Sequence, residues 1–407
     1  DLVCLHGDLL RELGRTDQSI TTFENALEIA IGDDQSCRAG IGQAEGLRIR
    51  GRYRDGLECL ASAQIAGEAI GSAQYLARIH GLKGNLHFPL GEIEQCMAAQ
   101  EKALNYGRET GSAEAQARAY SGLADVHYLQ GRMLSAGQMF ERCISLAKEN
   151  NLTTIIAANL SMLANTKVCL LEFAAGRAMF EEALRLSSAI GDYRAEIICR
   201  TALWNLQEEE GAFDELLESL QIAVDMSREF GLDAFVAFAN QSQSKAYLEL
   251  GQREKAIELA NESWDLIVEA NFQQFIGPLC LGIIARVSLD KERRTWAIDE
   301  GLRILSEGAV SHNHLLFHRD TMEVGLENSD WELLQRACGA LADYTRAEPL
   351  PLTDFYMARA QALRDYYQGH DREAAIAALR GLKAQAEQVG LNLALRRIDA
   401  ALGEAGQ

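Results

Sequence analysis

Three histidines near residue 315 form the densest group of side chains that could do chemistry. His312, His314 and His318 are followed closely by Asp320. His314 and His318 lie one helical turn apart, so a helix would present both imidazoles on one face, where they could ligate a metal ion. However, no third ligand lies at the spacing of a zinc site. The same pattern is also explained by two partly exposed histidines at the start of a helix, without any metal. We predict no metal site, and His314 and His318 are the candidates if one exists.

Motifs of the common nucleotide-binding and hydrolytic enzymes are missing from the sequence. The chain has no Gly-Lys dipeptide, which rules out a P-loop that cradles phosphate groups. It also lacks the H-E-x-x-H, G-x-S-x-G and EF-hand patterns. The stretch from Gly40 to Gly46 is glycine-rich, but its spacing does not fit a dinucleotide loop and no strand precedes it. We interpret it as helix packing, and we predict no enzyme and no cofactor.

The composition excludes further classes of protein. The 407 residues include 39 basic and 59 acidic side chains, and the formal charge of −20 repels nucleic acid and anionic lipid. Hydrophobic residues make up 48% of the chain, enough to bury a core, and no apolar run is long enough to cross a membrane. The nine cysteines contain no C-x-x-C pair and indicate reduced thiols in a cytoplasmic protein. Because Asp1 is not an initiator methionine, we expect the chain to be a piece of a longer protein.

A period of forty residues organises the sequence. One phase begins at Gly14, has Leu171 in place of a missing glycine, and holds Gly51, Gly91, Gly131, Gly211 and Gly251. A second phase holds Gly71, Gly111, Asn151, Gly191, Gly231 and Asn271. Glycine and asparagine tolerate the left-handed conformation that closes a helix, so both phases predict helix ends. Two helix ends per period predict two helices of about 16 to 18 residues in each repeat.

Small and large residues alternate at fixed distances from the first-phase glycine. Twelve residues after it, the copies have Ala26, Ala63, Ala103, Cys143, Ala183, Ala223 and Ser263. Nine residues after it, they have Phe23, Leu60, Gln100, Phe140, Phe180, Leu220 and Ala260. Small residues let two helix backbones approach closely, and the larger side chain fills the gap beside them. This alternation is typical of the tetratricopeptide helix-turn-helix.

The period predicts an all-α fold. It is a tetratricopeptide-like α-solenoid, in which helix-turn-helix repeats of about 40 residues stack into a right-handed superhelix. We expect regular repeats over residues 1–275, degenerate repeats over 276–347, and a final repeat with a capping helix over 348–407, all in one continuous solenoid. Pro349 and Pro351 predict an extended linker over residues 348–352, because proline cannot continue a helix and restricts the residue before it.

The first helix of each repeat should line the groove of such a superhelix. Six residues before the first-phase glycine, every copy has a polar side chain: Asp8, Glu45, Asn85, Asp125, Asn165, Asn205 and Lys245. Arg38, Arg78 and Arg118 form a second row near the start of the same helices. Ordered amide and guanidinium groups can hydrogen-bond an extended peptide, but they can equally bond to one another between stacked helices. Our groove-binding candidates are Arg38, Arg78, Asn85, Arg118, Asp125, Asn165, Asn205 and Lys245.

Four stretches resemble the C-terminal repeat region of bacterial class III adenylate/guanylate cyclases that carry a STAND-type NTPase module. They are residues 84–91, 122–133, 311–320 and 348–355, so the resemblance covers most of the chain. In that family the cyclase and the NTPase precede the repeats, and no catalytic residue of either can be carried over onto this chain. The resemblance implies a regulatory sensor arm that binds a signal or a partner. The sensor of a MalT-type activator would look similar, but that reading predicts a C-terminal helix-turn-helix, and the chain ends without a basic segment.

Three functions remain open from the sequence. The first is a non-catalytic sensor arm of a multidomain nucleotide-signalling protein, which binds a peptide or a partner, for example its own upstream domains. The second is a small-molecule sensor with its ligand near Arg78, Arg118 and Asp125. The third is an enzyme built on the weakly periodic residues 289–347. We favour the first, and expect no nucleic-acid or membrane partner.

Overall fold

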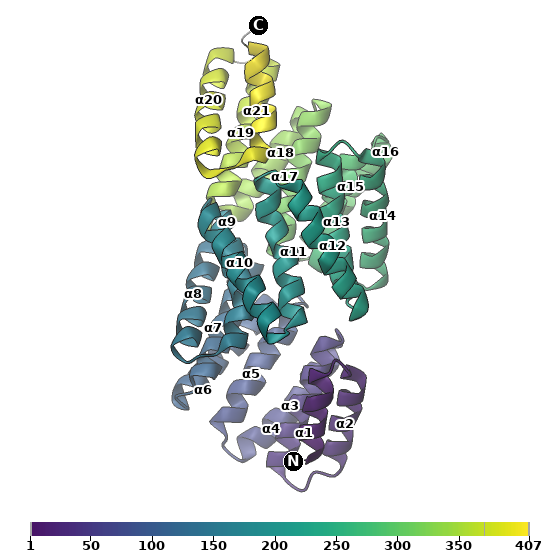
Figure 1. Cartoon of the computed structure of the whole chain (residues 1–407), viewed down its shortest axis with the longest axis vertical. Coiled ribbons are helices and arrows are strands. Elements are labelled where there is room, and N and C mark those ends of the chain that lie inside the picture. Colours follow the sequence, from purple (N-terminus) through teal and green to yellow (C-terminus); the bar gives the residue numbers. More distant parts are fainter. Residues whose placement is uncertain (1, 370, 406–407) are drawn as a thin grey trace. The chain divides into compact units, whose positions relative to one another are not determined.

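The computed structural model describes residues 2–369 and 371–405, and every regular element in those ranges is an α-helix (Figure 1). The first helices are α1 (Leu2–Glu12), α2 (Thr16–Glu28), α3 (Asp33–Ile49), α4 (Tyr53–Ala69), α5 (Ala73–His87), α6 (Ile93–Glu109), α7 (Ala113–Leu129), α8 (Met133–Glu149), α9 (Thr153–Cys169) and α10 (Phe173–Ile190). They are followed by α11 (Tyr193–Glu209), α12 (Phe213–Glu229), α13 (Asp233–Glu249), α14 (Arg253–Glu269), α15 (Gln273–Val287), α16 (Lys291–Ser306), α17 (Ser311–Asn328), α18 (Trp331–Thr345), α19 (Pro351–Gln368), α20 (Arg372–Val389) and α21 (Asn392–Ala405). The predicted all-α fold is confirmed.

Both glycine phases mark helix ends, as the period predicts. The first-phase glycines from Gly14 to Gly251 have φ between 69° and 76°, which is the left-handed region. Asn151 and Asn271 adopt the same conformation at their second-phase positions, with φ of 55° and 54°. Leu171 takes it as well, with φ of 62°, although a branched side chain is strained there. The backbone conformation at this position is therefore imposed by the repeat and not by the residue.

The region that follows the regular repeats also consists of helices. The copies expected near Arg293 and Trp331 correspond to α16 and α18. The expected linker over residues 348–352 is shorter than predicted, because Pro351 and Leu352 already belong to the first turn of α19. Proline is well accommodated there, since its missing N–H lies among the donors that a first turn leaves unbonded. None of the described helices is long and apolar enough to span a membrane.

The chain divides into two compact units. The N-terminal unit comprises Asp1–Leu129 and Gln138–Asn159, and the C-terminal unit comprises Gln130–Gly137 and Leu160–Gln407. One division follows the last residue of α7, and the other two fall within α8 and α9, so each of these two helices contributes residues to both units. Successive odd-numbered helices contact one another from α1 to α7 in the N-terminal unit and from α11 to α21 in the C-terminal unit, and we call the odd-numbered helices the inner helices. The expected change in repeat regularity at residues 275 and 347 stays a prediction.

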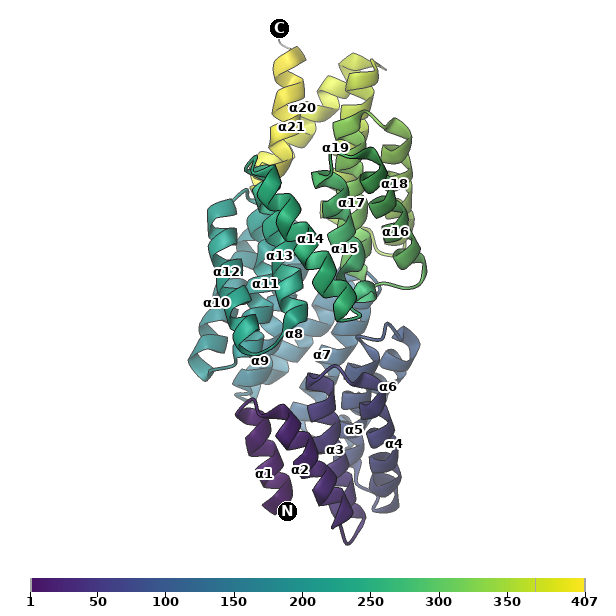
Figure 2. The same ribbon diagram turned by 90° about the vertical axis from the view of Figure 1, so that its right-hand side faces the viewer.

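In the N-terminal unit, α1 to α7 pack in chain order (Figure 2). The side chain of Phe23 on α2 lies where a Cβ atom at Gly7 on α1 or at Gly42 on α3 would stand. Gly40 and Gly46 of α3 likewise face Ala63 on α4 and Ile20 on α2. The glycine-rich stretch in α3 is therefore a helix-packing surface, as the sequence predicts.

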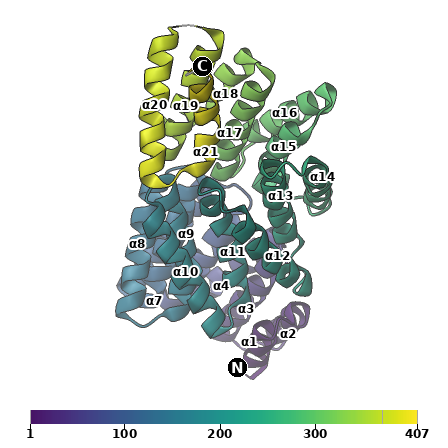
Figure 3. The same ribbon diagram turned by 45° about the horizontal axis from the view of Figure 1, so that its top comes forward.

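In the C-terminal unit, the inner helices form a closed row. The contacts run from α11 through α13, α15, α17 and α19 to α21, and α21 also contacts α11. Figure 3 shows α19, α20 and α21 side by side next to α17 and α18. The segment before α19 binds the start of α8, where Glu348 accepts hydrogen bonds from the backbone N of Leu134 (2.5 Å) and Ser135 (3.1 Å) and from Ser135 Oγ (2.6 Å). A carboxylate at a helix N-terminus satisfies unbonded N–H groups and interacts well with the helix dipole.

Replacing Leu171 tests whether the repeat imposes strain at this helix end. We expect Leu171→Gly to raise the unfolding free energy by about 1 kcal/mol, because glycine adopts φ of 62° without a Cβ clash. The measurement is urea unfolding followed by circular dichroism. The control is Leu170→Gly, one residue earlier, where φ is not positive and glycine should destabilise. A loss of stability in Leu171→Gly would contradict the assignment.

Candidate functional site

The inner helices of the N-terminal unit carry a ladder of ion pairs. Asp8 on α1 binds Arg38 on α3 (2.9 Å), and Glu45 on α3 binds Arg78 on α5 (2.7 Å). Arg11 joins the two pairs by contacting both Asp8 (2.7 Å) and Glu45 (2.9 Å). The predicted residues Arg38 and Arg78 are therefore brought onto one surface. Arg78 remains exposed, so its guanidinium is open to a further partner.

The ladder gives way to a more open polar surface on α5 and α7. Asn85 is exposed, and its Oδ1 accepts a hydrogen bond from Gln100 Nε2 on α6 (3.1 Å). Arg118 is exposed and pairs with Glu114 of its own helix (2.9 Å). The half-buried Asp125 carboxylate has no hydrogen bond or ion pair in the described part of the chain. Burial raises the pKa of Asp125 to about 7.

The remaining candidates lie in the C-terminal unit and are less accessible. Asn205 on α11 donates from Nδ2 to Asn165 Oδ1 on α9 (3.0 Å), a contact between equivalent positions of two repeats. Lys245 on α13 is fully buried, with only 1% of its surface exposed. It forms ion pairs with Glu208 at 2.9 Å and with Asp320 at 3.1 Å. In this unit the members of the polar row thus contact one another or buried carboxylates, although Asn205 Oδ1 has no hydrogen-bond partner among the described residues. Groove binding by these residues stays a prediction.

Lys245 belongs to a buried network of charged and polar side chains contributed by five inner helices. Glu208 on α11 also accepts a hydrogen bond from Arg319 Nη2 on α17 (2.6 Å). The neighbouring Glu209 binds Arg319 as well, and its Oε2 accepts a hydrogen bond from the Tyr356 hydroxyl on α19 (2.5 Å). Arg286 on α15 lies 3.5 Å from Asp320. Burial alone would lower the pKa of Arg286, but the carboxylates of Glu249 and Asp320 raise it, so the guanidinium stays charged.

The C-terminal helix α21 binds to the rim of this network. Arg397 pairs with Glu323 (2.7 Å) and Glu327 (2.8 Å) on α17, and Glu323 also pairs with Arg359 on α19 (2.7 Å). Burial would raise the pKa of Glu323, but the two arginines hold it at about 2. Arg396 reaches Glu249 at the end of α13 (3.4 Å). These charge pairs help α21 to close the row of inner helices.

The sequence predicted only one member of the network, Lys245. Two features of the sequence could have revealed the others. Glu208 and Glu209 are adjacent carboxylates at a predicted helix end, and Arg319 and Asp320 are adjacent opposite charges within a predicted helix. Charged residues are almost never fully buried unless they are paired, so each would need an opposite partner elsewhere. The spacing does not identify that partner, because Arg319 lies 110 residues from Glu209.

Removing the Lys245 charge tests whether the network holds the inner helices together. We expect Lys245→Met to lower the unfolding free energy by about 3–5 kcal/mol, because Glu208 and Asp320 lose a buried cation. The measurement is urea unfolding, with Lys255→Met on the exposed side of α14 as the control. Adding Asp320→Asn should restore part of the loss, since it removes one of the uncompensated charges. Equal stability of the Lys245 and Lys255 variants would contradict the role of the network.

The three histidines are packing residues in this structure. The His312 ring nitrogen Nε2 lies 2.6 Å from the Phe275 carbonyl oxygen, and the His314 ring stacks on Tyr344 at a centroid distance of 4.1 Å. Burial lowers the pKa of His312, His314 and His318 to about 4 each. Among the described residues, no group of three or more His, Cys, Asp or Glu side chains could hold a metal ion. That no metal ion binds at His314 and His318 stays a prediction.

The buried histidines make stability depend on pH. The pKa of His314 is about 4 in the folded chain and 6.5 when exposed, so the unfolded state takes up a proton first as the pH falls. Its stabilising contribution is present above pH 6.5 and should fall by about 2 kcal/mol by pH 5. His314→Phe keeps the stacking on Tyr344 but cannot be protonated. Urea unfolding at several pH values should show that, below pH 6.5, the unfolding free energy of the variant decreases less than that of the natural chain. Parallel profiles would contradict this prediction.

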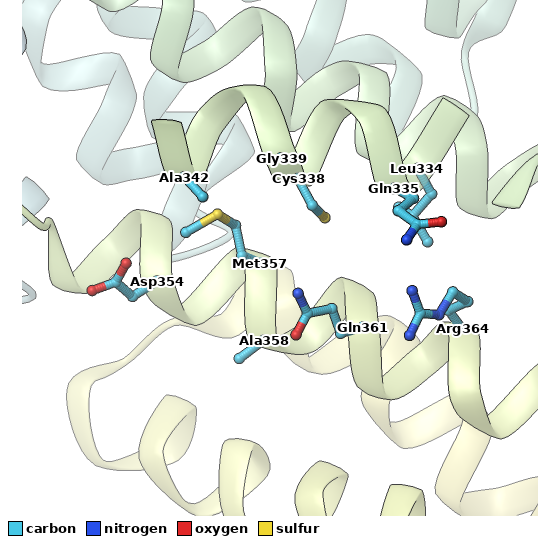
Figure 4. A pocket seen from close by; sticks show the side chains of 10 residues that line it. All are labelled: Leu334, Gln335, Cys338, Gly339, Ala342, Asp354, Met357, Ala358, Gln361 and Arg364. Atoms are coloured by element: carbon cyan, nitrogen blue, oxygen red, sulfur yellow. The ribbon is translucent and has the colours of Figure 1, made fainter. Parts of the chain in front are cut away.

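A separate hollow lies between α18 and α19 (Figure 4). Its volume is about 410 Å³. Cys338, Gly339 and Ala342 line it from α18, and Met357 and Gln361 line it from α19. The lining also includes Leu334, Gln335, Asp354, Ala358 and Arg364. Figure 4 shows Asp354 and Arg364 toward opposite ends of the hollow.

Comparison with known families identifies the repeats. Tetratricopeptide-repeat models match residues 75–149 and residues 1–30, and among curated protein sequences none matches the chain significantly. The fold is similar to that of a Rap protein complexed with Competence and Sporulation Factor, at 12% identity and a TM-score of 0.60. That match covers 90% of this chain and 98% of the Rap chain. It is also similar to NprR in complex with its cognate peptide NprX, at 14% identity and a TM-score of 0.56, covering 83% and 99%.

A further similarity involves a STAND protein with a tetratricopeptide repeat sensor, PH0952 from Pyrococcus horikoshii. It is 13% identical, covers 89% of this chain and 55% of the other, and has a TM-score of 0.45, which is too low to support an argument. At such identities the other two similarities establish the fold and nothing beyond it. The chain therefore has an all-helical, tetratricopeptide-like fold.

Proposed function

We propose that the chain is a regulatory binding module that recognises a segment of a peptide or a partner protein. One observation carries the proposal. In the N-terminal unit, Arg78, Asn85 and Arg118 stay exposed on the contacting helices α5 and α7, and the half-buried Asp125 of α7 has no partner among the described residues. A stack held together by its own polar contacts would leave fewer such groups open. The complexes of Rap with Competence and Sporulation Factor and of NprR with NprX support this kind of role.

The chemistry of this surface suits an extended segment. Arginine and asparagine side chains donate hydrogen bonds to peptide carbonyls, and asparagine and aspartate accept them from N–H groups. One polar position per repeat on neighbouring inner helices therefore offers partners at regular intervals along a bound chain. We assign the binding role to the N-terminal unit, because in the C-terminal unit the equivalent Lys245 is occupied by Glu208 and Asp320.

Peptide selection on the whole chain tests the proposal. Random peptides displayed on phage are enriched on the immobilised protein, and the affinity of an enriched peptide is then measured by fluorescence anisotropy. We expect Arg78→Ala with Arg118→Ala to weaken binding about tenfold, because charge-assisted hydrogen bonds are lost. The control is Arg52→Ala, which removes an exposed arginine that pairs with Asp55 of its own helix. The absence of any enriched peptide, or equal affinity of the double variant, would overturn the proposal.

We further propose that the module is a non-catalytic arm of a multidomain nucleotide-signalling protein. Support comes from the four sequence stretches that resemble cyclase-linked repeat regions. The similar families and solved structures do not support a link to a cyclase. Assays of the chain for cyclase and NTPase turnover test its non-catalytic role, and activity above background would reject it. The gene sequence upstream of Asp1 tests the linkage.

Small-molecule sensing is a second candidate, which the hollow between α18 and α19 favours. Its volume of about 410 Å³ lies within the usual range for ligand pockets. A thermal-shift screen of nucleotides and sugars separates the two functions, since a bound ligand raises the melting temperature by mass action. Replacement of Gly339 by Leu, which would fill the open space beside it, should abolish a shift that arises there.

A further inference from the structure

Gln100 breaks the packing rule of the repeats. It occupies the position nine residues after the first-phase glycine, where other copies have Phe23, Leu60, Phe140, Phe180, Leu220 or Ala260. It is the polar exception among these residues, and it is 1% exposed. A polar side chain in an otherwise apolar packing position costs stability unless it is fully hydrogen-bonded.

The slot around Gln100 has the shape of the slot around Phe23. The Phe23 ring fills the space left by Gly7 on α1 and Gly42 on α3. The Gln100 amide fills the space left by Gly84 on α5 and by Gly122 on α7, where a Cβ atom would overlap it. Both slots need glycines on the two flanking inner helices. The amide therefore stands where the repeat elsewhere places a phenyl ring.

The hydrogen bonds of Gln100 are incomplete. Its Nε2 donates to the Gly81 carbonyl (3.1 Å) and to Asn85 Oδ1 (3.1 Å). Its buried Oε1 has no partner in the described part of the chain. The amide thus connects to the exposed Asn85 and carries a free acceptor. A polar side chain at an apolar packing position of a repeat is expected where the residue serves a function at the expense of stability.

Asp125 lies on α7, one helical turn from Gly122, the residue against which the Gln100 amide packs. It follows Gly122 by three residues, so the two positions are one helical turn apart on the same face. Asp125 and Asn85 also occupy the same position of consecutive repeats on the contacting helices α7 and α5. Burial raises the pKa of the Cys96 thiol on α6 and of the Cys143 thiol on α8, and the Asp125 carboxylate raises both further. No cation is paired with Asp125 in the described ranges.

We propose that Asn85, Gln100 and Asp125 form a subsite for a cationic hydrogen-bond donor on the bound segment, a lysine or arginine side chain. The inference rests on the proposed peptide-binding function and specifies its partner. A lysine or arginine head group donates several hydrogen bonds and accepts none, which matches the Asp125 carboxylate and the Gln100 Oε1 atom, both without a partner among the described residues. The formal charge of −20 draws cationic segments toward the chain.

Peptide pools of defined charge test the subsite. Fluorescein-labelled octapeptide pools are random except for one central residue, fixed as Arg, Lys, Gln or Glu, and anisotropy reports their binding to the whole chain. At about pH 8, where the Asp125 carboxylate is ionised, we expect the Arg and Lys pools to bind about tenfold more tightly than the Glu pool. Asp125→Asn should abolish this preference.

Two variants separate the subsite from general effects. Asp33→Asn removes an exposed carboxylate of α3 in the same unit, so it changes the net charge equally and should keep the preference. Gln100→Leu places there the residue found at positions 60 and 220, so it should raise the melting temperature while weakening the cationic pools. If no pool binds, the proposed function fails. If pools bind without preference for Arg and Lys, or if Asp125→Asn keeps the preference, the subsite alone is overturned.

Discussion

Close approach of helix backbones is the constraint on which the structure depends. A single helix hairpin cannot bury its apolar face, so each must lie against the next, and small residues at fixed positions make that distance short. Gly7 and Gly42 admit the Phe23 ring between two inner helices, and Gly84 and Gly122 admit the Gln100 amide in the same way. The left-handed residues at the helix ends, including the unfavourable Leu171, keep the hairpins in this register. Packing thus determines the backbone, and side chains adapt to it.

The two units use their inner helices differently. In the C-terminal unit the row closes from α11 to α21, and the charges that face inward are buried with their counter-charges. Buried charge pairs contribute little net stability relative to apolar packing, but breaking one is costly, so they favour one arrangement of the helices over others. In the N-terminal unit the inner row is shorter and keeps exposed arginine and asparagine side chains. Binding is therefore better supported on the N-terminal unit, where polar groups remain available.

A repeat protein makes departures from its own pattern informative. Because every copy has the same packing geometry, a residue that differs at a packing position either serves another function or lowers the stability of the repeat. Leu171 is such a residue for backbone conformation, and Gln100 is one for core polarity. Gln100 donates a hydrogen bond to Asn85. The residue that departs from the packing rule is therefore in contact with the surface proposed for binding.

The sequence alone determined the local structure. The phase of Gly51 and its equivalents placed the helix ends, and the residues at the Phe23 position identified the packing slots, because helix closure and backbone distance depend on the residues at those positions themselves. Pro351 was assigned to a linker instead of a first helical turn, since proline is compatible with both. Only the tertiary structure decided which polar side chains meet. Glu209, Arg319 and Tyr356 come together because α11, α17 and α19 belong to one closed row, and the strength of a charge pair depends on distance in space, which no spacing along the chain records.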